Sequence, residues 1–267
     1  MRRIHDDVPA ALADEPDAVH RLRTSVRRLR NVLAAFRRYL DRDAAAALRS
    51  RLKELGDVLG KARDLEVRAQ QAAAAADTAG LDDAARSALV DPLRAAHLHA
   101  HAEAVRWVRS ERSRDLDRLL AEWAALPRLG DRAAQPARKA ARRTVRRQAR
   151  RTLDAAPRLA DPEAAHELRK AARRLRHTCD AITREPVGLL GRKTKELGDV
   201  GHRIQSVLGD HRDALLLAEH VRDHARVRTD DARAYDDVVD LCQGRALSAL
   251  ADLPATLGDL ARRAHGS

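Results

Sequence analysis

A histidine and three arginines recur with the same spacing in two segments of the chain. HRLRTSVRRLR occupies residues 20–30, and HELRKAARRLR occupies residues 166–176. Successive residues of an α-helix are turned by about 100°, which brings the histidine and the arginines of each segment to one side. Leucine, valine and alanine lie on the other side. Each segment is therefore predicted to be an amphipathic helix whose polar face is cationic.

A second pair of similar stretches follows these two segments. LGKARDL, residues 59–65, comes after the first, and LGDHRDA, residues 208–214, comes after the second. Two motifs that recur in the same order at nearly the same separation indicate an internal duplication, and the repeat is too long for a solenoid. We therefore expect two halves, residues 1–127 and 128–267, with PRLGDR at residues 127–132 as the linker.

The composition favours helices throughout. Aromatic residues make up 2% of the 267 residues, and 12 glycines and 9 prolines are too few for a turn-rich β fold. Short loops favour antiparallel neighbours, so the expected fold class is all-α, with two similar bundles side by side. Helical spacing predicts helices over residues 17–39, 44–76, 82–107, 113–126, 136–155, 163–183, 192–225, 230–250 and 254–264, with a break at Gly80 and a kink or break at Pro92.

The cationic faces point to a negatively charged ligand. Like charges stacked along a helix repel, and helical spacing leaves the faces nearly free of acids. A solvated face with scattered acidic partners is the alternative, but a linear polyanion explains why the face occurs twice. Arginine forks bind phosphate oxygens bidentately, and phosphates favour the charged form of a nearby histidine. The formal net charge of +12 agrees with a polyanionic partner.

The second motif adds cations and glycines to the same picture. Glycine inside a helix costs about 1 kcal/mol relative to alanine, so Gly56, Gly60 and Gly209 indicate that room is needed for a ligand or another helix. Asp64 and Asp213 could hold the neighbouring arginines in position. The cations that share a face with these glycines are Arg49, Lys53 and Arg63 in the first half, and His202 and Arg212 in the second.

One further helix is strongly basic. ARKAARRTVRRQARRT, residues 137–152, is expected to present a broad basic stripe made of Lys139, Arg142, Arg143, Arg146, Arg147 and Arg150, of which the first four are expected to bind the polyanion. Its counterpart in the first half would be IHDDVPAALADEP, residues 4–16, which is acidic. The two halves are therefore unequal in charge, and a polyanion is expected to bind more strongly to the second half.

The pattern HxxRxxxRRLR, given twice with LGxxRD downstream of each copy, resembles the conserved histidine α-helical domain (CHAD). The resemblance covers residues 17–221. It implies two four-helix bundles related by a pseudo-twofold axis around a basic central cavity. It also implies non-catalytic binding of inorganic polyphosphate and association with polyphosphate granules. The cavity residues that it implies are His20, Arg23, Arg27, Arg30, Lys53, Arg63, His166, Arg169, Arg173, Arg176, His202 and Arg212.

Two other functions remain open for the same residues. A nucleic-acid binder would also use phosphate contacts, and weak, non-specific binding of nucleic acid is expected in vitro. Single-strand binders usually stack bases on aromatic rings, but none of the aromatic residues lies among the repeated stripes, and Trp107 and Trp123 are expected to be packing residues. An enzyme that forms phosphohistidine or processes polyphosphate is the second alternative, although neither a P-loop nor HExxH occurs.

Metal binding is the remaining alternative. His97 and His101 are spaced i, i+4, as are His220 and His224, and that spacing can hold a metal. No thiolate lies near either pair in the sequence, so we expect no metal site and no cofactor. His211 falls toward the apolar side of its helix and is expected to be a buried histidine with its own hydrogen-bond partner.

The sequence sets expectations for partners and location. Cys179 and Cys242 form no CxxC pair, which disfavours a disulfide framework or a thiolate zinc site. The first residues carry charges where a signal peptide needs an apolar run, and no stretch is apolar enough to span a membrane. We expect a cytoplasmic protein, a monomer or a dimer, whose partner is inorganic polyphosphate.

Overall fold

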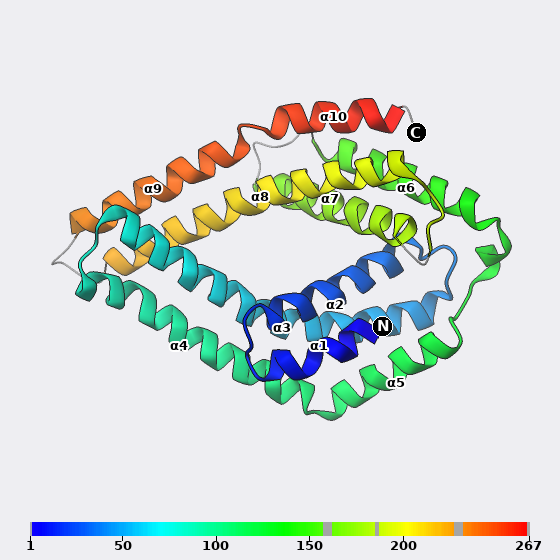
Figure 1. Cartoon of the computed structure of the whole chain (residues 1–267), viewed down its shortest axis with the longest axis horizontal. Helices are drawn as coiled ribbons and strands as arrows, with labels where there is room; N and C mark the ends of the chain where they lie inside the picture. Colours follow the sequence, from blue (N-terminus) through cyan, green and yellow to red (C-terminus); the bar gives the residue numbers. More distant parts are fainter. Residues whose placement is uncertain (1, 157–161, 185–186, 227–231, 266–267) are drawn as a thin grey trace. The chain divides into compact units, whose positions relative to one another are not determined.

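The computed structural model describes residues 2–156, 162–184, 187–226 and 232–265, and within these ranges it is helical without a named strand. The prediction of an all-α chain is confirmed (Figure 1). The helices are α1 (Arg2–Leu12), α2 (Ala18–Ala35), α3 (Arg42–Ala79), α4 (Asp83–Val108), α5 (Glu111–Ala125), α6 (Ala137–Asp154), α7 (Pro162–Thr183), α8 (Arg192–Ala225), α9 (Ala232–Leu250) and α10 (Leu253–His265), with a short 3₁₀ turn at Asp131–Ala134.

Local capping explains where the long helices begin and end. Asp41 accepts a 2.8 Å hydrogen bond from the amide of Ala44 at the start of α3. Gly80 then ends α3 in the left-handed conformation, with φ of 71°, so the predicted break is confirmed. Asp82 caps α4 in the same way, through the amide of Ala85 at 2.7 Å. Helix α4 continues through Pro92, so of the two predicted outcomes a break is wrong.

Helix α1 is an element that the sequence pattern did not predict. The helix has 11 residues, contains Pro9 and buries Ile4 and Ala11. The side chain of Asp7 accepts a 3.0 Å hydrogen bond from Ser25 of α2. Short, charged helices are marginal by themselves, and α1 is therefore stabilised by tertiary contacts that a reading of its own residues does not supply.

The described chain divides into two compact units. Unit 1 comprises residues 1–30, 41–128 and 213–244, and unit 2 comprises residues 31–40, 129–212 and 245–267. Each unit draws on residues from both sides of the predicted linker, because α2, α8 and α9 contribute to both. The repeated motifs predicted two duplicated halves that meet between residues 127 and 128. That duplication stays a prediction.

Unit 1 is built around the long antiparallel pair α3 and α4, which run side by side (Figure 1). Its apolar cluster combines alanines of α3 with Leu89 and Val90 of α4 and with residues of α8 and α9. Tyr235 of α9 is fully buried there, and its hydroxyl donates to the carbonyl of Ala85 at 3.2 Å. Trp107 and Trp123 are buried, so the prediction that they are packing residues is confirmed.

Unit 2 packs α6, α7, the first part of α8 and α10 around one apolar cluster. Two glycines of α8 allow close approach to α7. A Cβ on Gly198 would be 2.7 Å from Cβ of Cys179, and one on Gly201 would be 3.0 Å from the carbonyl oxygen of Ala172. Cys179 and Cys242 are both free and buried, and burial raises the pKa of Cys179 to about 12.

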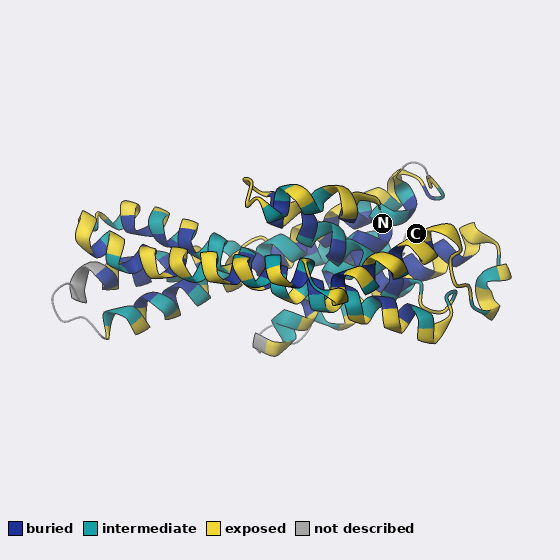
Figure 2. Cartoon of the chain, turned by 90° about the horizontal axis from the view of Figure 1, so that it is seen from below, coloured by how far each residue is buried: buried dark blue, intermediate teal, exposed yellow. Residues whose placement is uncertain are grey.

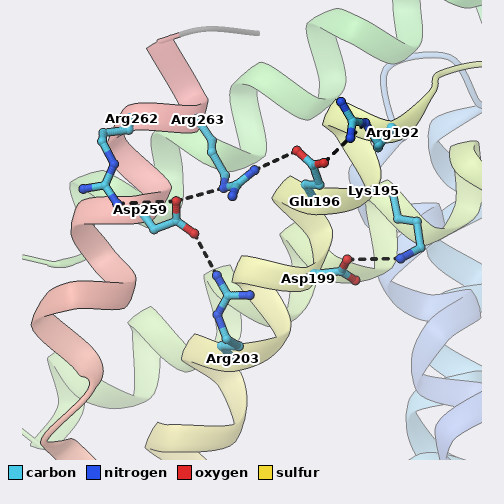
Figure 3. Close-up of polar contacts among 8 residues, drawn as sticks. All are labelled: Arg192, Lys195, Glu196, Asp199, Arg203, Asp259, Arg262 and Arg263. Carbon is cyan, nitrogen blue, oxygen red and sulfur yellow. Dashed lines mark hydrogen bonds and ion pairs between the residues drawn. The ribbon is translucent and has the colours of Figure 1, made fainter.

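Helix α10 is held on α8 by apolar contacts and by ion pairs. Leu253 and Leu260 are buried in the unit 2 cluster. Figure 3 shows Asp259 of α10 between Arg203 of α8, at 2.8 Å, and Arg263, at 2.9 Å. Arg263 also reaches Glu196 of α8 at 2.7 Å. Buried residues follow one side of the helices and exposed residues the other (Figure 2). Among the described helices, none is long and apolar enough to cross a membrane.

Candidate functional site

The first cationic face lies on α2 and α3, within unit 1. Helix α2 buries Val19, Leu22, Val26 and Leu33, as its spacing predicts, and this packing fixes which side its basic residues occupy. Leu48, Leu52, Leu55 and Leu59 are buried along α3. The members of this face are His20, Arg23, Arg27 and Arg30 of α2 together with Arg49, Lys53 and Arg63 of α3.

Glycines of α3 make room for arginines of α2. A Cβ on Gly60 would lie 3.6 Å from Nη2 of Arg23, and a Cβ on Gly56 would lie 3.2 Å from Nη1 of Arg30. Guanidinium groups of the neighbouring helix therefore lie against both glycines, with a tight contact at Gly56 and an ordinary van der Waals distance at Gly60. Two uses were expected for room at these glycines: a ligand, or close approach of another helix. In the structure, side chains of α2 approach the glycines, and its backbone does not.

Carboxylates contact several cations of the first face. Arg23 of α2 pairs with Asp64 at 2.8 Å, so Asp64 contacts an arginine of the neighbouring helix, whereas the expected partner was the adjacent Arg63. Lys53 pairs with Asp57 at 2.6 Å. Arg63 lies 2.9 Å from Glu66 and 3.4 Å from Asp17. The expectation of a face nearly free of acids is therefore wrong here. A helical wheel considers one helix at a time, so it omits carboxylates that reach the face from the adjacent helix, from the edge of the same helix or from the preceding loop.

The charges of this face influence one another. The pKa of His20 is lowered, first by burial and then by Arg63 and Arg27, whereas Asp17 opposes the shift. Burial also lowers the pKa of Arg30, with Arg49 acting in the same direction and Asp57 against it. A histidine with a lowered pKa is neutral near pH 7, so His20 adds hydrogen-bonding capacity rather than charge in the free protein.

The second cationic face lies on α7 and α8, within unit 2. Leu168, Ala172, Leu175 and Ile182 are buried along α7, and His211 of α8 is turned to the carbonyl of Ala246 at 2.9 Å. That contact confirms the predicted hydrogen-bond partner of His211, although the residue is half-buried where a buried one was expected. The members of this face are His166, Arg169, Arg173 and Arg176 of α7 together with His202 and Arg212 of α8.

The relation between arginine and glycine recurs on the second face. A Cβ on Gly209 would lie 3.5 Å from Nη2 of Arg169. Arg169 and Gly209 occupy the places in their motifs that Arg23 and Gly60 occupy in the first copy. The same local arrangement of motif helix, guanidinium and glycine is therefore present in both units.

His166 and Arg212 are directly hydrogen bonded. Nη1 of Arg212 donates to Nδ1 of His166 at 3.0 Å. An arginine offers only donors, so Nδ1 must carry the lone pair and the imidazole is neutral in this arrangement. Burial lowers the pKa of His166, and Lys170 and Arg212 lower it further, against Glu163 and Glu167. The histidine thus anchors an arginine of the next helix.

His202 lies in a similar environment farther back along α8. Its pKa is lowered by burial and then by Arg176, while Asp180 and Asp199 oppose the shift. Ser206 lies 3.5 Å from its Nδ1, and Arg176 lies 3.9 Å from Asp180. The structure therefore brings the cations of α7 and α8 together within unit 2.

The basic residues of α6 separate into two groups. Arg142 and Arg146 line a surface pocket with the start of α8. Arg143 instead donates to the side chain of Gln135 at 3.3 Å, and Lys139 is exposed. Arg192 and Lys193 complete the pocket, and sequence reasoning missed both. Their signal was the basic stretch RKTK directly after Gly191, where a long helix begins.

The histidine pairs considered for metal have other contacts. His97 bonds to the carbonyl of Ala62 at 3.1 Å and to Asp14 at 3.2 Å. His101 bonds to the carbonyl of Ala11 at 2.8 Å. The ring of His224 packs edge-on against Tyr235, with centroids 5.2 Å apart. Within the described residues, no group of three or more potential ligands is arranged to hold a metal ion.

Comparisons with known proteins agree on the family. The profile of the CHAD domain matches residues 1–222. An uncharacterized protein from Mycobacterium tuberculosis, Rv2226, is 32% identical over 221 residues, which is 79% of this chain and 41% of that protein. Protein MT2285 from another strain of that species, also uncharacterized, shows the same identity and coverage. The chain thus spans less than half the length of these curated relatives.

Two solved structures share the fold. PptA from Streptomyces chartreusis superposes with a TM-score of 0.73 at 22% sequence identity, over 98% of this chain and 94% of that one. The CHAD domain from the plant Ricinus communis gives a TM-score of 0.64 at 24% identity, over 99% and 87% of the two chains. The repeated histidine and arginine motifs, the helical architecture and the match over residues 1–222 lead to one conclusion: the chain belongs to the CHAD domain family.

Proposed function

We propose that the chain binds inorganic polyphosphate, without cleaving it, through the first and second cationic faces. One observation carries this proposal: a histidine and three arginines on one helix are joined by cations of a second helix, and this arrangement occurs in both units. Polyphosphate binding is a general property of the family. A repeating polyanion matches a repeated cationic face, because each arginine offers a planar fork to phosphate oxygens.

The contacts of the two faces suggest how much each face contributes to polyphosphate binding. On the first face, Asp64 and Asp57 accept hydrogen bonds from Arg23 and Lys53, and Glu66 lies 2.9 Å from Arg63. A phosphate must displace these carboxylates before it binds there. On the second face Arg212 is held by a neutral histidine, which competes less strongly for a cation. The second face also has an acid near it, because Asp180 lies 3.9 Å from Arg176. From the charge difference between the halves we nevertheless infer that the second face is the stronger of the two.

Two faces on one chain give the ligand more than one point of attachment. A long polyphosphate that contacts both would gain effective concentration for the second contact. We infer that affinity rises with chain length, that the paired faces arose by duplication of a four-helix bundle, and that the chain associates with polyphosphate granules.

Charge reversal tests the proposal. The double variant Arg27→Glu/Arg173→Glu places one reversed charge on each face. The matched control is Arg94→Glu/Arg150→Glu, which changes two exposed arginines of α4 and α6 and alters the net charge equally. Titration with polyphosphate of defined length should show affinity lowered at least tenfold in the first variant and little changed in the control.

Salt and competition complete the test. Affinity should fall steeply with added salt because phosphate contacts dominate. Duplex DNA at equal phosphate concentration should not displace long polyphosphate. Wild-type affinity in the folded face variant, or displacement by DNA, would refute the proposal.

A further inference from the structure

A pocket in unit 2 gathers cations that lie outside the second cationic face. Its volume is about 560 Å³, within the range of small-molecule sites. The described lining residues are Arg138, Arg142, Val145 and Arg146 of α6, Leu190 and Gly191 of the preceding loop, and Arg192, Lys193 and Thr194 of α8. Five of them are cations and none is acidic. The pocket shares no residue with the second cationic face.

Helix α6 presents its pocket arginines as a regular row. Arg138, Arg142 and Arg146 follow one another at i, i+4, so their Cα atoms are about 6 Å apart along the helix. The packed side of α6, which includes Ala141 and Val145, is buried in the core of unit 2. This packing fixes the rotation of α6 and keeps the row at the pocket. Three guanidinium groups in a row can each donate to successive phosphate groups.

The start of α8 forms the opposite wall. The amides of Thr194 and Lys195 donate to the carbonyl of Gly191 at 3.0 and 3.3 Å. The amides of Arg192 and Lys193, which precede them, have no acceptor within the helix itself, and α8 is 34 residues long. Its N-terminus therefore adds partial positive charge to the pocket. Lys193 and Thr194, in the first turn of α8, also line the pocket.

A carboxylate that contacts one of the pocket cations is shared with another helix. Figure 3 shows Glu196 between Arg192, at 3.6 Å, and Arg263 of α10, at 2.7 Å. The closer contact is with α10, outside the pocket. Lys195 is engaged with Asp199 at 3.2 Å. Since Glu196 is divided between two guanidinium groups, it neutralises only part of the charge of Arg192.

From these observations we propose that the pocket is a separate binding site for a compact oligophosphate, with tripolyphosphate as the probe. This goes beyond long-chain binding by the two faces and does not depend on it. The five cations match an anion of similar charge, and the cavity holds a short chain. None of the described lining residues is aromatic, so the pocket offers no stacking surface for a nucleobase. Recognition rests on the phosphates alone.

The test compares two pairs of substitutions in the whole chain. Arg142→Ala/Lys193→Ala removes one cation from each wall of the pocket, and both side chains are exposed, so folding should be kept. Arg132→Ala/Arg150→Ala removes two exposed cations of unit 2 outside the pocket. Isothermal titration with tripolyphosphate should show a saturable site whose affinity falls at least tenfold in the first pair, as expected for lost charge-assisted hydrogen bonds. The control should keep wild-type affinity.

Three results would overturn the pocket assignment. Equal losses in the two pairs would mean that net charge alone attracts the anion. Tighter binding of adenosine triphosphate than of tripolyphosphate, with the same sensitivity to Arg142 and Lys193, would identify a nucleotide site instead. Loss of tripolyphosphate binding in Arg27→Glu/Arg173→Glu would place the anion on the faces. Long polyphosphate titrated into the same variants tests the faces separately, so either proposal can fail while the other stands.

Discussion

The guanidinium group of Arg169 on α7 lies against Gly209 on α8, where a Cβ would be 3.5 Å from Nη2. Arg23 and Gly60 form the same contact between α2 and α3, at 3.6 Å. Both distances are ordinary van der Waals separations, so the glycines leave enough space for one methyl group and no more. The arginines are thus positioned by the shape of the next helix as well as by their own.

Substitutions at Gly209 should separate stability from binding. Gly209→Ala should raise the free energy of unfolding by about 0.5–1 kcal/mol, because alanine has the higher helix propensity, and leave polyphosphate affinity unchanged. Gly209→Leu should displace Arg169 and lower affinity several-fold. Urea denaturation and polyphosphate titration measure the two effects. Wild-type affinity in a folded Gly209→Leu variant would show that Arg169 does not need this position.

Gly198 provides the contrasting glycine of α8. A Cβ there would be 2.7 Å from Cβ of Cys179, and neither atom can move without its backbone. Gly198→Ala should therefore lower the free energy of unfolding by about 1–3 kcal/mol, the cost of overpacking. Denaturation of this variant beside Gly209→Ala gives opposite signs for the same substitution on the same helix. A stabilised Gly198→Ala variant would contradict the close packing of α7 and α8.

Binding of polyphosphate should be coupled to proton uptake by His166. Its pKa is lowered in the free protein by burial and nearby cations, and phosphates would raise it. The bound form then has the higher pKa, so affinity increases as pH falls through the interval between the bound and free values. Protonation also ends the hydrogen bond from Arg212 to Nδ1, which frees that arginine for phosphate.

His166→Gln isolates this contribution. The wild type should gain up to about tenfold in affinity per pH unit and per proton, between pH 7.5 and 5.5, and His166→Gln should gain less. Titration in two buffers of different ionisation enthalpy counts the protons taken up. Because the phosphates of the ligand titrate equally for both proteins, identical pH profiles would exclude a role for His166.

Removing the carboxylate that holds Arg23 should strengthen binding to the first face. Asp64→Asn ends a 2.8 Å ion pair, and exposed pairs of this kind contribute about 0.2–1 kcal/mol. Affinity for polyphosphate should rise about two- to fivefold. Asp115→Asn, which ends pairs with Arg118 and Arg51 away from the face, changes the net charge equally and should have a smaller effect. An equal rise in both would assign the gain to net charge.

The attachment of α10 should depend more on burial than on its ion pairs. Leu260 is fully buried, and Leu260→Ala should lower the free energy of unfolding by about 2–5 kcal/mol. Asp259→Asn should cost about 1 kcal/mol, because its pairs with Arg203 and Arg263 are partly exposed. Added salt should reduce the second effect and not the first. Denaturation at low and high salt makes the comparison, and a larger cost for Asp259→Asn would reverse this ranking.

The sequence was sufficient for elements whose signals are local. Helical periodicity placed α3 and α8 within a few residues of their observed ends, and the capping residues Asp41 and Gly80 mark two of those ends. The apolar sides of α2 and α7 were readable because burial follows the helical repeat. The membership of each cationic face followed from the same periodicity, since residues on one side of one helix need no tertiary information to be grouped.

Helix α1 and Pro92 show where local signals were insufficient. Helix α1 contains a proline and several charges. Its two buried residues, Ile4 and Ala11, are too few to form an apolar pattern that predicts a helix. Helix α4 continues through Pro92 because the packing of unit 1 outweighs the local cost. In both cases the deciding contacts come from residues distant in the sequence.

What the sequence determined by itself is the identity of the helices after α1, the cationic side of the two motif helices α2 and α7, and the repetition of that side. Only the tertiary structure decided which carboxylates reach Arg23 and Arg63, that Arg212 bonds to His166, and that Arg142 meets Lys193 at a pocket. The physical reason is range. Helical periodicity is set by neighbours three and four residues apart, whereas ion pairs and pockets between helices depend on how separate helices pack.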